Sequence, residues 1–222
     1  IRGNNHHSIY KMISLLKDKY GIKDHHAIVL KKVVPIQAGL GGGTADAAST
    51  LRIFQKLYDL QMSREEIIEV CRIVGADVPF NYFNVPAVVS GIGDVIEPFE
   101  MKKTYSVLLV KPRSGVSTKE AYETLDMRLC DHPDIERLRK ALESGSNIKG
   151  LLGNSLEQPA LKLNRQIRKI KEDLASCFDG EVLMSGSGST IFCIHEDPEK
   201  IRPLIEKFRV KGNYVRFTET LS

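Results

Sequence analysis

The stretch Pro35–Ala48 (PIQAGLGGGTADAA) places four glycines within positions 39–43. Glycine loses more conformational freedom on folding than any other residue, so a run of this density needs a physical reason. The β-branched run Ala27–Val34 comes before it and predicts a strand. Apolar residues at helical spacing follow it, from Ala47 to Tyr58, and predict a helix. The sequence therefore predicts a strand, a glycine loop and a helix in succession.

This succession is typical of a phosphate-binding loop. Backbone N–H groups converge on the anion, and the helix N-terminus adds its partial positive charge. Without Cβ atoms, phosphate oxygens reach the amides directly. Thr44 is placed to bind phosphate or a metal ion through its hydroxyl, and Asp46 to hold Mg²⁺ or to cap the helix. The alternative is a loop whose glycines only permit a turn, but four glycines directly before a helix favour phosphate binding.

Two other nucleotide-binding fingerprints do not fit this loop. A Walker A sequence needs a lysine directly before Thr44, where Gly43 stands. A dinucleotide-binding G-x-G-x-x-G motif that starts at Gly39 needs a third glycine where Thr44 stands.

Composition limits the class of protein. The 222 residues are 42% hydrophobic and 27% charged, which suits one large or two small globular domains. The net charge of +4 fits an anionic small-molecule substrate, while the absence of a Lys/Arg block argues against nucleic acid. There is no apolar run of about 18 residues, so we expect no membrane span. The four cysteines are scattered, which predicts reduced thiols in a cytoplasmic protein without a zinc site.

The remaining pattern predicts an α+β protein divided near Met101–Thr104, into residues 1–103 and 104–222. The first part has a helix that Gly21 ends, a helix between a capping box at Ser63 and Gly75, and a strand at Ala87–Val89. The second part has the element order of a ferredoxin-like sheet. Its strands are expected at Tyr105–Val110, Glu181–Ser185, Thr190–His195 and Asn213–Thr218, and its helices near Pro133–Glu143 and Leu156–Cys177 and after Ser117 and Asp197.

Asp77 is the candidate catalytic base. It stands in an otherwise apolar stretch, where a carboxylate is costly unless it has a partner or a chemical role. The alternative is that Asp77 caps the next helical turn. The residues alone leave both interpretations open.

Gly39–Ala48 resembles the phosphate loop of the GHMP kinases, a family that includes galactokinase, homoserine kinase and mevalonate kinase. Its triple glycine is most similar to the branch acting on 4-diphosphocytidyl-2-C-methyl-D-erythritol, which usually has GLGGGSSDAA. Here Thr44-Ala45 replaces Ser-Ser, so one of two hydroxyls is lost. Further motifs follow in family order over nearly the whole chain: GADVPF at Gly75–Phe80, GIGD at Gly91–Asp94, GVSTKEAY at Gly115–Tyr122 and MSGSGST at Met184–Thr190.

The resemblance implies a fold of two domains, an N-terminal ribosomal-protein-S5-like ATP-binding domain, partial here, and a C-terminal ferredoxin-like domain. It implies transfer of the γ-phosphate of ATP, with Mg²⁺, to the 2-hydroxyl of 4-diphosphocytidyl-2-C-methyl-D-erythritol in the non-mevalonate isoprenoid route. Asp77 matches the family's proposed base. The implied nucleotide contacts are Lys32, Pro35, Gly39, Leu40, Gly41, Gly42, Gly43 and Thr44.

Thr44 and Asp46 are the implied metal ligands, and Tyr122, Ser187 and Gly188 the implied acceptor contacts. Lys32, Tyr122 and the Ser/Gly loop each have a plainer alternative. Lys32 would be a solvated strand lysine, Tyr122 a packed helix residue, and the Ser/Gly loop at 185–189 an ordinary turn. The repeated glycines in that loop favour close approach of a ligand.

Two of the family's segments do not occur in this sequence. One contains P-x-K-[IL]-N-L, whose lysine partners the catalytic aspartate, and the other contains G-Y-H. We therefore expect an N-terminal truncation, with exposed strand edges and weak activity of this chain. Other open alternatives are a sugar, homoserine or phosphomevalonate acceptor, or a nucleotide-binding protein without turnover. We expect a monomer or weak homodimer.

Overall fold

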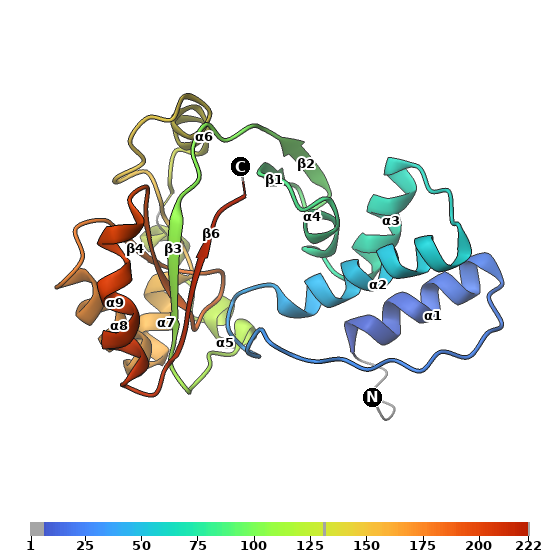
Figure 1. Ribbon diagram of the computed structural model, residues 1–222, viewed down its shortest axis with the longest axis horizontal. Coiled ribbons are helices and arrows are strands. Elements are labelled where there is room, and N and C mark those ends of the chain that lie inside the picture. The colour runs from blue at the N-terminus through green and yellow to red at the C-terminus, as the bar shows by residue number, and fades with distance from the viewer. Residues whose placement is uncertain (1–6, 131, 222) are drawn as a thin grey trace. The chain divides into compact units, whose positions relative to one another are not determined.

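The computed structural model describes residues 7–130 and 132–221, and it divides into two compact units (Figure 1). Unit 1 takes in the described residues up to Val34 and those from Gly41 to Pro98. Unit 2 takes in Pro35–Leu40 and the described residues from Phe99 onward. The short segment Pro35–Leu40 thus belongs to unit 2, although the residues on both sides of it belong to unit 1. The domain division after residue 103 stays a prediction.

Unit 1 is mainly helical, and α1 lies alongside α2 (Figure 1). Its core is built from the apolar faces of these helices, with Met12, Leu51 and Val78 fully buried. This burial follows from apolar residues three and four positions apart, which share one helix face. The helices of the described part of unit 1 are α1 Ser8–Tyr20, α2 Gly42–Tyr58, α3 Arg64–Val74 and α4 Val78–Phe83.

The predicted helix caps of unit 1 are confirmed. Gly21 follows α1 in the left-handed conformation, with φ of 64°. The Ser63 hydroxyl accepts a hydrogen bond from the Glu66 N–H at 3.2 Å, as a capping box requires. Gly75 follows the last residue of α3, and its N–H donates to the Cys71 carbonyl at 3.1 Å.

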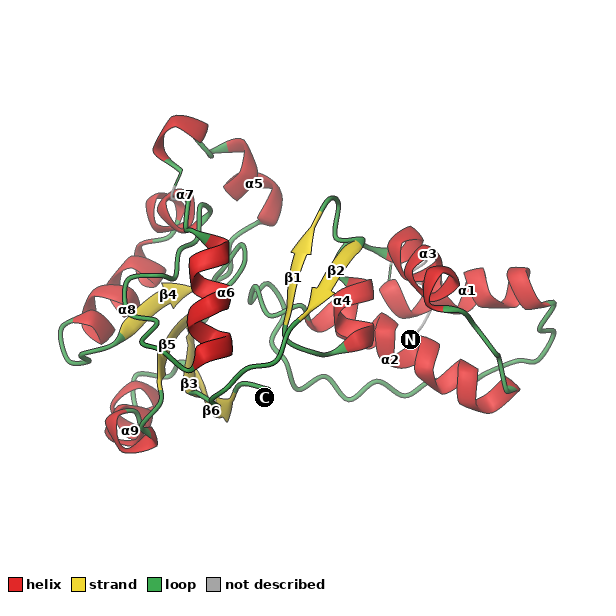
Figure 2. Ribbon diagram, turned by 90° about the horizontal axis from the view of Figure 1, so that it is seen from above, coloured by secondary structure: helices red, strands yellow, loops and turns green. Residues whose placement is uncertain are grey.

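A β-hairpin completes unit 1. Strands β1 Ala87–Ser90 and β2 Val95–Pro98 pair antiparallel (Figure 2). Gly91 and Gly93 in the connecting turn have φ of 65° and 89°, a region that favours glycine. The first strand was predicted from the sequence, but the second, which is four residues long and ends in a proline, was not.

The predicted strand at Ala27–Val34 is wrong: these residues form no regular element. Val29 is 96% exposed and Val33 is 66% exposed. A strand is stabilised by a paired neighbour, and β1 and β2, the strands found in the described part of unit 1, pair with each other. The β-branched residues therefore have no ladder to join in this structure.

Unit 2 contains a four-stranded antiparallel sheet in the order β4-β5-β3-β6. This is the strand order of a ferredoxin-like fold, so the prediction from the element order is confirmed. All four strands were expected within a residue or two of their observed ends. Their bounds are β3 Ser106–Lys111, β4 Glu181–Met184, β5 Ile191–His195 and β6 Tyr214–Glu219.

One predicted helix of unit 2, Leu156–Cys177, is two helices. Asn164 interrupts it with extended backbone, and its side-chain oxygen caps the second helix by accepting from the Gln166 N–H at 2.9 Å. The helices of unit 2 are α5 Thr118–Glu123, α6 Ile135–Ser144, α7 Glu157–Leu163, α8 Arg165–Ala175 and α9 Arg202–Arg209, with the 3₁₀ turns η1 Met127–Leu129 and η2 Pro198–Lys200.

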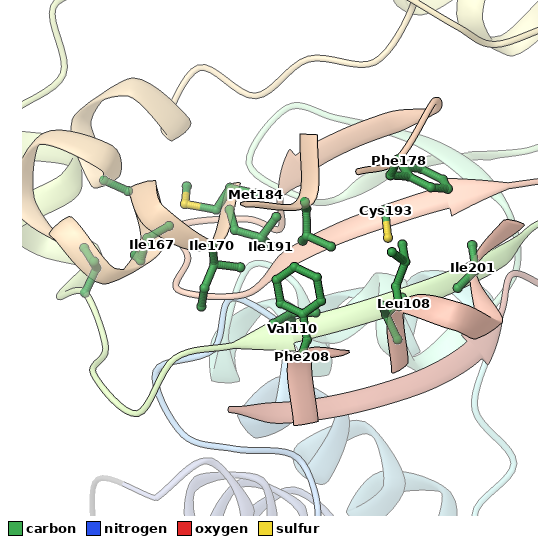
Figure 3. Packing of buried hydrophobic residues seen from close by; sticks show 14 of the residues in the cluster. Leu108, Val110, Ile167, Ile170, Phe178, Met184, Ile191, Cys193, Ile201 and Phe208 are labelled. Atoms are coloured by element: carbon green, nitrogen blue, oxygen red, sulfur yellow. The ribbon is translucent and has the colours of Figure 1, made fainter. Parts of the chain in front are cut away.

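The main core of unit 2 lies between one face of the sheet and helices α7, α8 and α9 (Figure 3). Leu108 and Val110 of β3 pack there with Ile170 of α8 and Phe208 of α9. Full burial of a side chain as large as Phe208 stabilises the fold by about 1.5–3 kcal/mol. Among the described residues, no helix has both the length and the apolar character needed to cross a bilayer.

Candidate functional site

The N-terminus of α2 carries the main features of a phosphate site. Gly41 stands at the N-cap position with φ of 61° and ψ of 18°. Within the described chain no side chain caps this terminus, and its first turn holds no acidic residue. The first N–H groups of a helix have no partner inside the helix, and the helix dipole places partial positive charge beside them. This end of α2 is therefore suited to an anion.

The glycines at this terminus have separate physical reasons. Gly41 adopts the left-handed conformation, which other residues adopt only at a cost. A Cβ on Gly42 would lie 3.1 Å from Cγ1 of Val34, so glycine lets this preceding segment approach the helix. Gly43 accepts a hydrogen bond on its carbonyl from the Ser8 hydroxyl at 2.6 Å, which ties α1 to the same terminus.

Thr44 connects this terminus to α4. Its hydroxyl donates to the Gly41 carbonyl at 2.7 Å and accepts from Nδ2 of Asn81 at 3.1 Å. The same amide nitrogen of Asn81 donates to the Asp77 carbonyl at 2.8 Å. One asparagine thus links the glycine loop to the residue expected to be the base. Asn81 was missed in the sequence, since it lies outside the recognised motifs.

Asp77 stands at the N-cap position of α4, but its side chain forms no capping hydrogen bond. The residue is exposed, and its carboxylate has no hydrogen-bond or ion-pair partner among the described residues. The capping interaction that was the alternative to a chemical role is therefore not formed. A Cβ on Gly75 would lie 3.8 Å from Cγ2 of Thr44, so the turn that carries Asp77 adjoins the start of α2.

Gly93 of the β-hairpin packs against the turn that carries Asp77. A Cβ at position 93 would lie 2.3 Å from the carbonyl oxygen of Ala76, the residue before Asp77. The hairpin turn is held in place because Asp94 accepts from the Ile92 N–H at 3.1 Å and forms an ion pair with Arg72 at 3.4 Å. The GIGD and GADVPF motifs are therefore in direct contact.

Lys32 and Asp46 form an ion pair with each other. Both side chains are partly buried, at 31% and 18% exposed. The Lys32 ammonium lies 3.4 Å from the position that a Cβ on Gly42 would take, so it is beside the first turn of α2. The alternative of a freely solvated lysine does not fit this arrangement.

In unit 2, the segment Pro35–Leu40 is held by the Ser/Gly loop. The Gly39 carbonyl accepts from the Ser185 hydroxyl at 2.8 Å, and the Ala38 carbonyl accepts from the Thr190 N–H at 3.2 Å. A Cβ on Gly39 would lie 2.1 Å from the Ser185 carbonyl oxygen. Close packing against this loop is thus one reason for the glycine at position 39.

The Ser/Gly loop also touches the GVSTKEAY motif. The hydroxyls of Ser187 and Thr118 are hydrogen-bonded at 2.9 Å. Ser117 caps α5 as predicted, accepting from the Glu120 N–H at 3.4 Å. Tyr122 on α5 is 60% exposed, so it is not the packed helix residue that was its alternative.

Two residues that the sequence analysis did not single out, Asn154 and Glu157, hold the start of the Ser/Gly loop in place. Nδ2 of Asn154 donates to the carbonyls of Met184 and Gly186, each at 2.8 Å. The buried carboxylate of Glu157 accepts from the Met184 N–H at 2.7 Å and pairs with Lys171. No local signal would have found them, because both act through contacts to residues 27 to 32 positions away.

The comparison with known proteins decides the family. A model described as GHMP kinases N terminal domain matches residues 7–92, and one described as GHMP kinases C terminal matches residues 126–213. A 4-diphosphocytidyl-2-C-methyl-D-erythritol kinase of Thermodesulfovibrio yellowstonii is 34% identical over 220 residues, which cover 96% of this chain and 76% of the relative. The chain belongs to the GHMP kinase family. It is an ATP-dependent kinase of the α+β GHMP fold.

Two further similarities agree with this assignment. A 4-diphosphocytidyl-2-C-methyl-D-erythritol kinase of Bacillus velezensis is 36% identical over 202 residues, covering 90% of this chain and 70% of the relative. A crystal structure of 4-(cytidine 5'-diphospho)-2C-methyl-D-erythritol kinase superposes with a TM-score of 0.82 at 28% identity, covering 100% of this chain and 81% of that chain.

Thr44 and Asp46 do not fit a shared magnesium site in this GHMP kinase. Residues two positions apart on a helix do not face each other. Their side chains accordingly have different neighbours, since Thr44 bonds to Asn81 and Asp46 pairs with Lys32. No group of three His, Cys, Asp or Glu residues suited to a metal occurs in the described ranges.

Burial protects two of the cysteines of this kinase. Cys71 lies in the core of unit 1 and Cys193 in the core of unit 2. Desolvation raises the pKa of each thiol to about 12. The thiolate is the reactive form of cysteine, so neither residue is suited to nucleophilic or redox chemistry.

Proposed function

We propose that this GHMP kinase transfers the γ-phosphate of ATP to the 2-hydroxyl of 4-diphosphocytidyl-2-C-methyl-D-erythritol. Two relatives of that name, 34% and 36% identical over most of both chains, support the acceptor. The motifs GADVPF and GVSTKEAY, which resemble those of this branch, support it as well. We further propose that this reaction serves the non-mevalonate isoprenoid route.

The proposed phosphate contacts begin with the free amides of α2. Gly41, Gly42, Gly43 and Thr44 would direct their N–H groups at the polyphosphate, and the helix dipole would add to the attraction. Lys32 would contribute a full positive charge beside the same turn. Pro35, Gly39 and Leu40 would shape the approach to the loop. Since phosphoryl transfer depends mostly on positioning and charge neutralisation, these groups would supply much of the catalysis. A bound magnesium ion would supply further neutralisation of phosphate charge.

Asp77 would act as the base. In the transfer, the oxygen of the acceptor hydroxyl forms a bond to the γ-phosphorus, and the bond from that phosphorus to the β–γ bridging oxygen breaks. ADP leaves with the electrons of the broken bond, and the hydroxyl proton passes to the Asp77 carboxylate. A carboxylate without a protein partner, as observed here, is free to accept this proton.

Three residues of unit 2 are proposed to contact the acceptor. Tyr122 presents an exposed ring, which is suited to stacking on a flat base such as cytosine. Ser187, which is half-buried, would bind its polar part through its hydroxyl, and the buried Gly188 would shape the main chain of the same loop. Near α5, a cleft of about 350 Å³ offers further polar contacts. It is lined by Thr124, Leu125, Asp126, Ser155, Gln158, Pro159 and Lys162.

One observation carries the proposal most directly. The uncapped glycine start of α2 is linked through Thr44 and Asn81 to the turn that bears the unpartnered carboxylate of Asp77. An anion site and a free base are therefore held in fixed relation within unit 1.

The test is an ADP-release assay with ATP, Mg²⁺ and a panel of acceptors: 4-diphosphocytidyl-2-C-methyl-D-erythritol, homoserine, phosphomevalonate and galactose. We expect turnover with the first alone. Asp77→Asn should lower kcat by about 10²- to 10⁴-fold, the range for a lost general base, with ATP affinity within about twofold of the original. Asp18→Asn, an exposed aspartate on α1, is the matched control and should leave kcat unchanged.

Each alternative gives a distinct result. Turnover with another acceptor would reassign the substrate within the family. Nucleotide binding without turnover on any acceptor would indicate a nucleotide-binding protein without catalysis. Full turnover by Asp77→Asn would refute its role as base.

A further inference from the structure

The ion pair between Lys32 and Asp46 has an unusual position. Lys32 places its ammonium beside the first turn of α2, where the unsatisfied amides of the helix already concentrate positive charge. Two like charges close together destabilise each other unless an anion lies near both. Asp46 is the acidic residue that the structure shows paired with this lysine.

Asp46 is placed to compensate Lys32 without filling the phosphate site. It lies in the second turn of α2, beyond the four residues Gly41–Thr44 whose amides face outward from the helix start. Its carboxylate reaches Lys32, while its backbone carbonyl accepts from the Thr50 hydroxyl at 2.8 Å inside the helix. The amides at the start of α2 therefore stay open while the lysine is neutralised.

We propose that Asp46 is an exchange partner for Lys32: it holds the ammonium when the loop is empty and gives it up to a polyphosphate. This inference rests on the proposed nucleotide site and adds the regulation of that site. Phosphate carries more charge than a carboxylate and also gains the α2 amides, so it displaces Asp46 from the lysine. The displaced carboxylate then lies close to the anion and weakens its binding.

This proposal assigns Asp46 a different role from metal ligation. A metal ligand would strengthen nucleotide binding only when Mg²⁺ is present. An exchange partner competes with phosphate whether or not Mg²⁺ is present, because it acts through Lys32. The two roles therefore predict opposite effects when the charge of Asp46 is removed.

The experiment measures the affinity of the full chain for adenylyl imidodiphosphate by calorimetry, once with EDTA and once with Mg²⁺. Asp46→Asn keeps the shape of the side chain and removes its charge. In EDTA we expect it to bind the probe about two- to fivefold more tightly, as expected for release of a partly exposed ion pair. Asp46→Ala should act in the same direction, and thermal unfolding checks that both variants are folded.

A double-variant comparison tests whether the effect passes through Lys32. Lys32→Met alone should weaken binding of the probe, and adding Asp46→Asn to it should give no gain. Asp59→Asn, at the other end of α2, is the matched control and should leave the affinity unchanged. The gain should also shrink as salt is raised, since salt screens charges that are partly exposed.

The remaining outcomes overturn the proposal. An affinity that falls only with Mg²⁺ would make Asp46 a metal ligand. An affinity that is unchanged in EDTA, or lower, would show that Asp46 does not compete for the lysine. If the unaltered chain fails to bind the probe at all, the proposed nucleotide site itself is refuted. If the unaltered chain binds the probe but Asp46→Asn binds it no more tightly, only the proposed exchange between Asp46 and phosphate is refuted.

Discussion

Replacing Gly93 by alanine tests how this residue supports the turn that carries Asp77. The new Cβ would lie 2.3 Å from the carbonyl oxygen and 2.9 Å from the carbonyl carbon of Ala76. Both atoms belong to the backbone, so they cannot rotate away as the end of a side chain would. The position also has φ of 89°, which L-residues other than glycine rarely adopt.

The two effects can be given separate magnitudes. Left-handed backbone costs an alanine about 1–2 kcal/mol. Forcing an extra methyl into a packed site costs about 1–3 kcal/mol more. Gly93→Ala should therefore lower the free energy of unfolding by about 2–5 kcal/mol.

Gly21→Ala is the matched control for this change. Gly21 lies in the same unit with φ of 64°, and a Cβ there would meet nothing within 4 Å. This variant should lower the free energy of unfolding only by the cost of the left-handed backbone, about 1–2 kcal/mol. The difference between the two variants then isolates the contact with Ala76.

The assay is urea unfolding followed by circular dichroism, with turnover measured on the folded fraction. Because Ala76 precedes Asp77, a shift of this turn should also lower kcat in Gly93→Ala but not in Gly21→Ala. The reasoning fails if Gly93→Ala is no less stable than Gly21→Ala, since the contact with Ala76 would then carry no energy.

Two further predictions concern protonation and thiol reactivity. Burial raises the pKa of Tyr20 to about 12, and the Tyr20 hydroxyl, ahead of Lys19, lowers the pKa of Glu66. The contribution of Tyr20 to folding stability is present below pH 10 and is lost as the pH rises toward 12. The contribution of Glu66 to folding stability is lost as the pH falls below its unfolded pKa of about 4.5. Tyr20→Phe should therefore flatten the pH dependence of stability at both ends in urea titrations; an unchanged profile would contradict this. In the native protein, a thiol reagent should modify the exposed Cys177 while Cys71 and Cys193 stay unmodified, which peptide mass spectrometry would show; early labelling of either buried thiol would contradict it.

Features decided by neighbouring residues were predictable from the sequence. The capping box at Ser63 and the helix stop at Gly21 each depend on groups within about one helical turn. The glycine loop before α2 is of the same kind, because the run and the helix pattern are adjacent. The strand order of unit 2 followed from its element order, since few topologies accommodate that succession.

Features decided by distant contacts were not predictable. The strand expected at Ala27–Val34 depends on a paired neighbour, about which the local pattern carries no information. Asn164 divides a helix whose apolar spacing continues on both sides, because an internal asparagine and a capping asparagine look alike in the sequence. The roles of Asn81 and Asn154 rest on contacts to residues 37 and 30 positions away.

Asp77 shows a further reason why a feature cannot be predicted from the sequence. An N-cap and a free catalytic carboxylate call for the same residue before the same helix. The sequence therefore could not separate them. The structure shows that the capping bond is not formed, and the catalytic role stays a prediction.

Unit 2 is built from two separate segments of the chain, and this affects how it folds during synthesis. Its segment Pro35–Leu40 is held by a loop 146 positions downstream of Gly39. A ribosome adding about 5–20 residues each second needs on the order of ten seconds to cover that interval. During this time the stretch leading into the glycine loop waits without its final neighbours, and closure over so long a separation slows folding. A piece cut at Phe99 would also lose this segment, so the unit cannot be produced intact by trimming the chain at one point.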